Sequence, residues 1–238
     1  AHPARQGPAA PIILHDTSPA AYPWGVVVSS WTGPQLGLDL PGGHLDQSKA
    51  IGWVTLDAAK KMFASAGKDL TALSAAAKRP GFKAVPLGLK ASLAFDNSIR
   101  KQASKNVIGV LPGKAQADEH ILYSAHWDHI GHCEPVTGDG ICNGALDNAS
   151  GIAGLIALAQ AQVKAGPADR SMIFLAVTAE ESGLLGSQYY AENPVYPLAK
   201  TAGGVNMDGL NVFGPTRDVT IVGGGKSELG ALLARGVM

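Results

Sequence analysis

Three short apolar runs in this chain are each followed, within three residues, by a histidine or a carboxylate. The runs cover residues 121–125, 172–177 and 204–207, and the polar residues that follow them are His126, Glu180, Glu181 and Asp208. Short apolar runs bounded by turn residues are typical of strands buried inside a sheet. Because the ligand crevice of an open parallel sheet lies outside the carboxyl ends of its strands, the pattern predicts one polar site rather than a solvated face.

The region from residue 89 onward alternates between strand-like and helix-like segments. Its apolar patterns predict strands at residues 89–95, 106–111, 121–125, 171–178, 203–207 and 218–222, and helices at residues 151–163 and 184–192. Asn148 and Ser150 are the two candidate N-caps of the first of these helices. We therefore expect an α/β fold with a mixed, mostly parallel sheet and helices on both of its faces.

Residues 1–88 carry a separate mixed pattern with no evident catalytic residue. Strands are expected at residues 11–15, 24–28 and 51–55, and helices at residues 57–63 and 70–77. Trp24, Trp31 and Trp53 either line a ligand groove or pack against other side chains, and packing is the favoured interpretation. The sequence thus predicts two domains, a small α/β unit at residues 1–88 and a larger unit at residues 89–238.

The charge balance excludes two classes of partner. Lysine plus arginine and aspartate plus glutamate each number 19, so the chain has no basic surface for nucleic acid or for an anionic membrane. No apolar run reaches the roughly 18 to 20 residues of a membrane span. The chain begins without methionine and stops just after an apolar helical pattern at residues 229–233, so we expect a fragment of a longer precursor. The oligomeric state is left open.

Cys133 and Cys142 are the two cysteines, and both lie in a short glycine-rich loop. A disulfide between them would contribute about 2 to 3 kcal/mol by closing this loop. The alternatives are two free thiols, or a structural zinc site that also uses His129 and His132. We favour the disulfide, which indicates an oxidising compartment.

The polar residues at the predicted strand ends are suited to holding metal ions. His126 offers an imidazole, and Asp128 is placed to hydrogen-bond its second ring nitrogen. Asp147 precedes a helix N-terminus and has two oxygens with which to bridge two metals. Glu180 and Glu181 are adjacent and therefore diverge, so that one can bind metal while the other remains a general base. No lysine or arginine lies near these acids in sequence to pair with them.

Four motifs occur in the chain in the order H-W-D, G-A-L-D-N-A-S-G, A-E-E-S-G-L-L-G-S and N-M-D. In this order they resemble the co-catalytic zinc aminopeptidase family, which includes bacterial leucyl aminopeptidases and glutamate carboxypeptidase-type enzymes. The resemblance implies that His126 and Asp208 bind one zinc, that Glu181 binds a second, and that Asp147 bridges them. It also implies that Glu180 is the general base in the hydrolysis of an N-terminal peptide bond of a peptide substrate, and that the peptide bond after Asp147 is cis.

The chain departs from this family in one respect. The family supplies a final histidine to the second zinc from a downstream segment, and no histidine follows His132 here. We therefore expect the peptidase domain to be incomplete at its C-terminal end and the fragment's activity to be affected. The alternatives to an aminopeptidase are a dizinc carboxypeptidase of the same fold and a non-catalytic, receptor-like relative. His129 and His132 are interpreted as loop residues rather than ligands.

Residues 1–88 resemble a protease-associated domain, the small α/β insert of several secreted peptidases. The likeness rests on the segments A-A-P-I-I-L-H-D, P-A-A-Y-P-W and I-G-W-V-T-L-D-A-A-K-K-M-F. It implies a partial insert domain that faces substrate and carries no chemistry of its own. Together with the expected disulfide, it predicts a periplasmic or extracellular protein.

Overall fold

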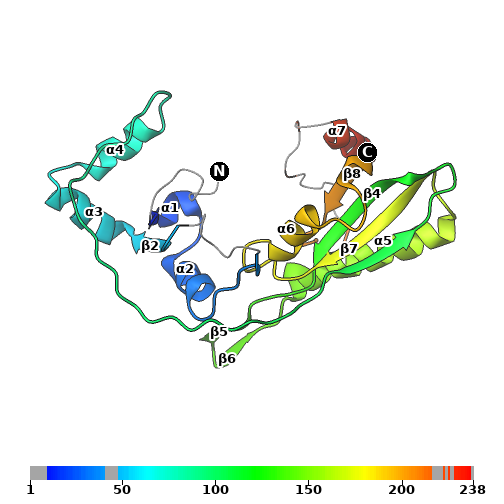
Figure 1. Cartoon of the computed structure of the whole chain (residues 1–238), viewed down its shortest axis with the longest axis horizontal. Helices are drawn as coiled ribbons and strands as arrows, with labels where there is room; N and C mark the ends of the chain where they lie inside the picture. The colour runs from blue at the N-terminus through cyan, green and yellow to red at the C-terminus, as the bar shows by residue number, and fades with distance from the viewer. Residues whose placement is uncertain (1–9, 41–47, 216–221, 223–224, 226–227, 237–238) are drawn as a thin grey trace. The chain divides into compact units, whose positions relative to one another are not determined.

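The computed structural model describes residues 10–40, 48–215, 222, 225 and 228–236. The chain divides into two compact units, of which the first comprises residues 1–33 and 39–101 and the second residues 34–38 and 102–238 (Figure 1). The domain boundary that the sequence predicts after residue 88 stays a prediction. Among the described residues, no helix has the length and apolar character needed to cross a bilayer.

The first unit is built on a pair of parallel strands, β1 (Ile12–His15) and β2 (Gly52–Thr55). Four helices accompany them: α1 (Thr17–Ala20), α2 (Trp24–Trp31), α3 (Leu56–Ser65) and α4 (Leu70–Ala77). Side-chain caps start three of these helices, because Asp16 accepts the N–H of Ser18, Thr55 that of Ala58 and Asp69 that of Thr71. The two strands and the two later helices confirm the sequence-based prediction for these segments.

Residues 24–28 were expected to form a strand, and this prediction is wrong because they begin helix α2. The three consecutive valines favour a strand by local propensity. In the helix, however, Trp24 and Trp31 are seven residues apart and so share a face. The ring of Trp24 lies 5.7 Å from that of His15, and the ring of Trp31 lies 6.2 Å from that of Trp53. These aromatic contacts outweigh the local preference.

The second unit contains a four-stranded sheet in the order β3-β7-β4-β8 (Figure 1). Its strands are β3 (Val107–Leu111), β4 (Gln116–His126), β7 (Arg170–Val177) and β8 (Thr201–Asn206). β4 runs parallel to both β7 and β8, whereas β3 is antiparallel to β7. The sheet is therefore mixed and mostly parallel, as expected.

Helices cover both faces of this sheet, and the side chains of β7 alternate between them. Ile173, Leu175 and Val177 pack with Tyr190 of α6 (Leu185–Glu192). On the opposite face, Phe174 packs with Leu155 of α5 (Ser150–Ala165). Because the strand is covered on both sides, its sequence is an almost continuous apolar run. The predicted fold class is confirmed.

Residues 89–95 were expected to form a strand, but residues 89–101 contain no helix or strand. The apolar side chains of Leu93, Phe95 and Ile99 are 65%, 67% and 86% exposed. Alternating apolar residues form a strand only where a neighbouring strand receives their N–H and C=O groups, and this segment has no such partner among the described residues. The strand expected at residues 218–222 lies outside the described residues, apart from Val222. The last described element is α7 (Glu228–Gly236).

An antiparallel hairpin follows β4 and consists of β5 (Gly131–Val136) and β6 (Asp139–Cys142). A disulfide joins Cys133 to Cys142 across it, with the two Cα atoms 5.9 Å apart. The predicted disulfide is confirmed. The two alternatives, a pair of free thiols and a structural zinc site that uses both cysteines, are therefore wrong. The hairpin leaves the sheet at the same edge at which the parallel strands end.

Candidate metal centre

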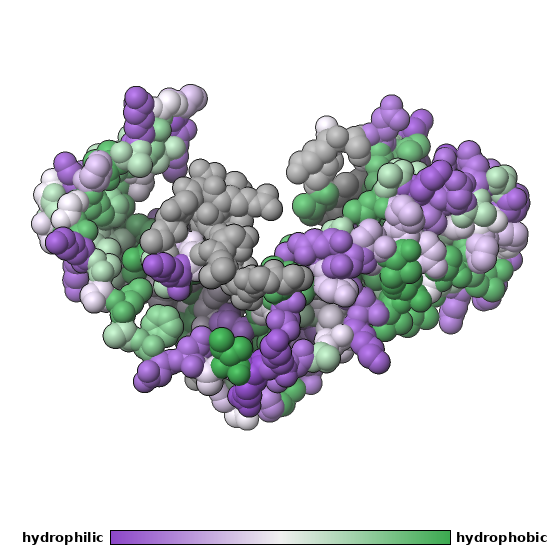
Figure 2. Space-filling model, in the orientation of Figure 1, coloured by the Kyte–Doolittle hydropathy of each residue, from purple (hydrophilic) through white to green (hydrophobic). Residues whose placement is uncertain are grey.

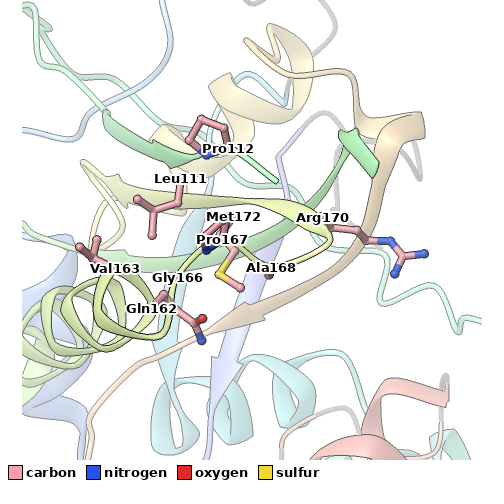
Figure 3. A pocket seen from close by; sticks show the side chains of 9 residues that line it. All are labelled: Leu111, Pro112, Gln162, Val163, Gly166, Pro167, Ala168, Arg170 and Met172. Atoms are coloured by element: carbon pink, nitrogen blue, oxygen red, sulfur yellow. The ribbon is translucent and has the colours of Figure 1, made fainter. Parts of the chain in front are cut away.

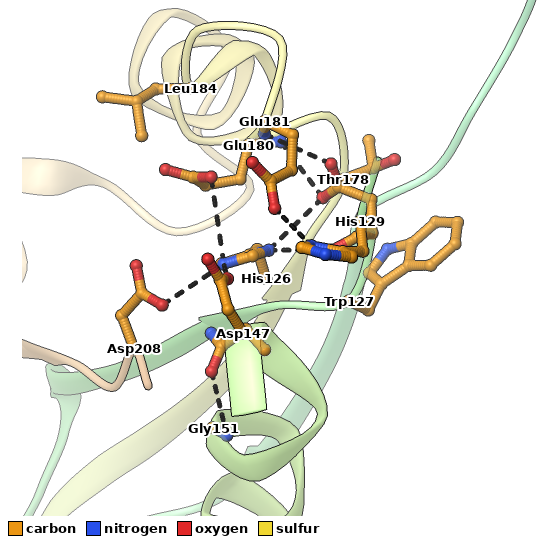
Figure 4. A network of polar contacts seen from close by, with 12 residues as sticks. His126, Trp127, His129, Asp147, Gly151, Thr178, Glu180, Glu181, Leu184 and Asp208 are labelled. Carbon is orange, nitrogen blue, oxygen red and sulfur yellow. Dashed lines mark hydrogen bonds and ion pairs between the residues drawn. The ribbon is translucent and has the colours of Figure 1, made fainter. Parts of the chain in front are cut away.

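The parallel strands bring the sequence-predicted polar residues to one edge of the sheet. His126 is the last residue of β4 and lies opposite Val177, the last residue of β7. The loop after β7 carries Glu180 and Glu181, and the loop after β8 carries Asp208. Figure 4 shows these side chains converging with that of Asp147, which comes from the segment before α5. The structure thus brings together all five residues that the sequence selected as metal ligands or general base.

His126 lies at the centre of this cluster and its side chain is 1% exposed. Its Nδ1 lies 3.0 Å from the main-chain oxygen of Asp128, and since a carbonyl only accepts, Nδ1 carries the proton of the neutral ring. Nε2 lies 3.0 Å from Asp147 Oδ1 and 3.4 Å from Asp208 Oδ1, yet it has no hydrogen-bond partner in the part of the chain that the structure describes. A buried nitrogen lone pair that faces two carboxylates is the arrangement of a metal ligand.

Asp128 contributes to the site in a different way from the one expected. Its main-chain oxygen, rather than its carboxylate, contacts the His126 ring, and the nearer carboxylate oxygen is 3.8 Å from Nδ1. The carboxylate instead accepts the N–H of Glu180 at 3.1 Å and that of Glu181 at 3.4 Å. Asp128 therefore ties the imidazole at the end of β4 to the loop that follows β7.

Asp147 lies in the irregular segment η2 (Ala145–Ala149) that leads into α5. The peptide bond between Asp147 and Asn148 is cis, as the family resemblance implies. The buried Asn148 side chain accepts the N–H of Gly151 at 2.9 Å and that of Gly209 at 3.2 Å, and it donates to the Met207 oxygen. Of the two candidate caps, Asn148 thus acts on the start of α5 and links it to the loop of Asp208.

Gly151 is required at this point by close packing. A Cβ atom there would lie 2.3 Å from Asn148 Oδ1 and 2.6 Å from the main-chain oxygen of Met207. The spacing Asp147, Asn148, Gly151 in the sequence therefore reflects one packed unit, in which the glycine lets α5 approach the loop after β8.

Glu180 and Glu181 point in different directions. The Glu180 carboxylate approaches His126, with 3.9 Å between Oε2 and Nε2. The Glu181 carboxylate instead contacts His129, with 2.5 Å between Oε1 and Nδ1. Sequence reasoning treated His129 as a loop residue and so missed this contact. The signal available was its position three residues after His126, which alone does not distinguish a site residue from a loop residue.

Two groups of side chains at this edge have the donor types that hold a metal ion. One comprises His126, Asp147 and Asp208, and the other comprises His129, Asp147 and Glu181, with the donor atoms of each group within 4.8 Å of one another. Asp147 belongs to both groups. A carboxylate shared in this way is suited to bridging two neighbouring cations.

The charges of the cluster are not balanced by cationic side chains. Within the described parts of the chain, the ion pairs of its four carboxylates involve only histidine, and none involves lysine or arginine. Burial raises the pKa of Glu180, and the neighbouring carboxylates raise it further. Burial lowers the pKa of His126, but the Asp128 carbonyl and three carboxylates outweigh this effect and raise it. Such concentrated negative charge fits divalent cations.

An apolar pocket of the second unit lies away from this cluster. It has a volume of about 220 Å³ and is lined mainly by apolar side chains at the start of β7 and the end of α5, which is the opposite edge of the sheet (Figure 3). Hydrophobic side chains also lie at the surface over α5 (Figure 2), where Ile156 and Val163 are exposed. None of the metal-centre residues lines the 220 Å³ pocket.

Comparison with known proteins gives one family match, to Peptidase family M28 over residues 106–237. The aminopeptidase NAALADL1 of Mus musculus is 30% identical over 143 residues, which cover 56% of this chain and 18% of that protein. The aminopeptidase YwaD of Bacillus subtilis is 34% identical over 93 residues, covering 39% of this chain and 18% of that protein. A glutamate carboxypeptidase 2 homolog of Caenorhabditis elegans is 32% identical over 128 residues, which cover 51% of this chain and 15% of that protein.

Solved structures give similar matches. A peptidase M28 precursor from Shewanella amazonensis is 30% identical with a TM-score of 0.34, covering 43% of this chain and 22% of that one. An aminopeptidase from Aneurinibacillus sp. strain AM-1 is 23% identical with a TM-score of 0.40, covering 87% of this chain and 41% of that one. The chain thus spans less than a fifth of the length of the three curated relatives named above.

Proposed function

Because this chain belongs to peptidase family M28, we propose that it is the catalytic part of a zinc-dependent aminopeptidase that hydrolyses the N-terminal peptide bond of peptides. The family relationship expected from the four sequence motifs is confirmed. The observation that carries the proposal is the unpaired, buried Nε2 of His126, which faces two carboxylates that no lysine or arginine neutralises in the described residues.

The donor set fits zinc. Histidine nitrogen and carboxylate oxygen are both common zinc ligands, and the set contains no thiolate. In the proposal, His126 and Asp208 hold one zinc, Glu181 belongs to the other, and Asp147 bridges the two positions. Bound zinc supplies Lewis acidity toward the scissile carbonyl and the attacking water.

Glu180 is the proposed general base. Its carboxylate belongs to neither of the two metal-type groups, so it remains free to accept a proton. The raised pKa of Glu180, caused first by burial, makes it a stronger proton acceptor. Glu180 takes the proton of the attacking water and delivers it to the leaving amine. Asp128 holds the main chain at Glu180 and Glu181 so that the two carboxylates diverge.

The charge around the centre favours an aminopeptidase over a carboxypeptidase. An exopeptidase must recognise the free end of its substrate, which is an ammonium group in one case and a carboxylate in the other. The described residues of the centre are rich in carboxylates and include no lysine or arginine to pair with a substrate carboxylate. The described residues of the centre therefore offer no side-chain cation to hold a substrate carboxylate, which supports the aminopeptidase.

The disulfide supports a location outside the cytosol. Structural disulfides persist in oxidising compartments, and the Cys133–Cys142 bond closes the hairpin next to the metal centre. We therefore assign the protein to the periplasm or the extracellular space. The substrate-facing role of residues 1–88 as a protease-associated domain remains part of this proposal.

The general base is tested with Glu180→Gln, assayed on leucine p-nitroanilide with zinc present. Removing the base should lower turnover by about 10²- to 10⁴-fold, while the zinc content stays that of the wild type. Glu192→Gln is the matched control, since Glu192 lies on α6 outside the metal centre and accepts a hydrogen bond from Gln188. Full turnover by Glu180→Gln would remove Glu180 from this role. A zinc-loaded wild-type chain that hydrolyses no aminoacyl substrate would contradict the proposed activity.

A further inference from the structure

His129 is a polar residue of the centre to which the proposed mechanism gives no role. It lies in the loop between β4 and β5, and its side chain and that of Glu181 are each 22% exposed. Its Nδ1 contacts Glu181 Oε1 at 2.5 Å. An ionised carboxylate only accepts hydrogen bonds, so His129 is the donor. The second oxygen of Glu181 remains free for another partner.

The ring of His129 is held in place from its other side. Gly144 follows the β5/β6 hairpin and has a φ of 65°, and a Cβ atom there would lie 2.7 Å from His129 Cβ and 2.9 Å from Cγ. Any other residue at position 144 would therefore displace the imidazole. Since residues 129 and 144 flank the hairpin, the Cys133–Cys142 disulfide closes the segment that brings them together.

The short contact distinguishes between two roles for His129. Ligands of a tetrahedral zinc with bonds of about 2.0 to 2.1 Å lie about 3.3 Å from one another. The Nδ1 of His129 and the Oε1 of Glu181 are closer than that, at the distance of a hydrogen bond between them. A ring N–H that donates to a metal-binding carboxylate fits the observed geometry, as outer partners of metal ligands commonly do.

We propose that His129 is a positioning residue, which donates a hydrogen bond to Glu181 and holds that carboxylate toward the cation position shared with Asp147. The inference rests on the proposed two-zinc function, because it assigns the group that orients one of the ligands. It implies that the second position depends on the loop after β4 as well as on its own ligands.

The test is zinc titration of the full 238-residue chain by calorimetry with a competing chelator. The wild type should show two binding events, and Glu181→Gln identifies the one that uses Glu181. His129→Ala should weaken this event by about 10- to 100-fold and leave the other unchanged. His129→Asn retains an N–H donor at the position of Nδ1 and should restore most of the affinity. His132→Ala, which removes an exposed histidine of the same segment, should bind zinc as the wild type does.

The outcomes separate this inference from the proposed function. If His129→Ala bound two zinc ions with the affinities of the wild type, the positioning role would be overturned. Loss of the second zinc in both His129→Ala and His129→Asn would overturn it in favour of direct ligation by the imidazole. A single event in the wild type, abolished by Asp208→Asn, would also overturn it while leaving the first zinc position intact. No zinc binding at all would instead contradict the proposed function.

Discussion

Strand β4 carries two buried histidines, one in its amino-terminal half and one at its carboxyl end, and the two halves are surrounded differently. Near the amino end, His120 packs on Tyr196 with 5.2 Å between the ring centroids. The acids beside it are paired with cations, because Glu119 contacts Arg170 and Asp118 contacts Lys200, each at 2.7 Å. At the carboxyl end, the carboxylates around His126 have no lysine or arginine partner among the described residues.

The difference between the two ends shows what distinguishes the acidic residues of a binding site from acidic residues on an ordinary surface. Both ends contain the same residue types at similar sequence density. The acids at the amino end form exposed ion pairs, which contribute little to stability. The acids at the carboxyl end remain without cations although they surround a buried ring, and such an arrangement needs a cation from outside the chain.

The largest expected effect comes from removing the shared carboxylate. Asp147→Asn should abolish the binding of both zinc ions and lower turnover by about 10³-fold or more, since metal ions supply several kcal/mol of transition-state stabilisation. Asp118→Asn, which removes an acid at the other end of β4, should leave both quantities unchanged. Elemental analysis of dialysed protein and the leucine p-nitroanilide assay measure the two effects. If Asp147→Asn retained two zinc ions per chain, the carboxylates at the carboxyl end of β4 would differ from those at the amino end in no way that concerns zinc.

A smaller effect concerns stability. Zinc at 100 times its dissociation constant should stabilise the folded second unit by about 2.7 kcal/mol, because it binds the folded state. Amide hydrogen exchange of β4 and β7 should report this gain, and a chelator should reverse it. Asp147→Asn should lose the gain while Asp118→Asn keeps it. Equal exchange rates with and without zinc would show that the carboxyl end does not bind the cation.

The smallest effect concerns the amino end. Lys200 lowers the pKa of Asp118 through a hydrogen bond and charge attraction, so Lys200→Ala should return that pKa toward its ordinary value. The lowered pKa implies that the pair's contribution is present above the unfolded pKa of Asp118 and is lost as pH falls through the folded pKa. NMR titration of the Asp118 carboxyl measures the shift. The zinc affinity of Lys200→Ala should equal that of the wild type. A changed affinity would show that the residues at the amino end of β4 influence the metal centre.

Much of the second unit could be predicted from sequence because its strands are defined by local apolar patterns. β7 is apolar from Met172 to Val177, and β4 and β8 each end where the polar residues begin. Parallel strands place their carboxyl ends at one edge, so the convergence of His126, Glu180 and Asp208 follows from topology. Their individual roles as ligands and base stay predictions.

The errors arose where a contact between distant residues decides the outcome. Residues 24–28 have the composition of a strand, and the ring contacts that accompany the helix join Trp24 to His15 and Trp31 to Trp53. Residues 89–95 alternate as a strand does, but a strand also needs a neighbour. His129 acquires its role from Glu181, which is 52 residues away, and from Gly144 behind it. A local pattern does not contain such information.

The hydrogen bonds of Asn148 also constrain the order in which the centre assembles during folding. Asn148 bonds Met207 and Gly209, which lie 59 and 61 residues later in the chain. Closing so long a segment is slow compared with forming a helix or a hairpin. Asp208 lies between the two contacted residues, so the proposed first cation position is not complete until β8 has docked beside β4. The rate of zinc uptake during refolding therefore reports the arrival of the last described strand of the sheet.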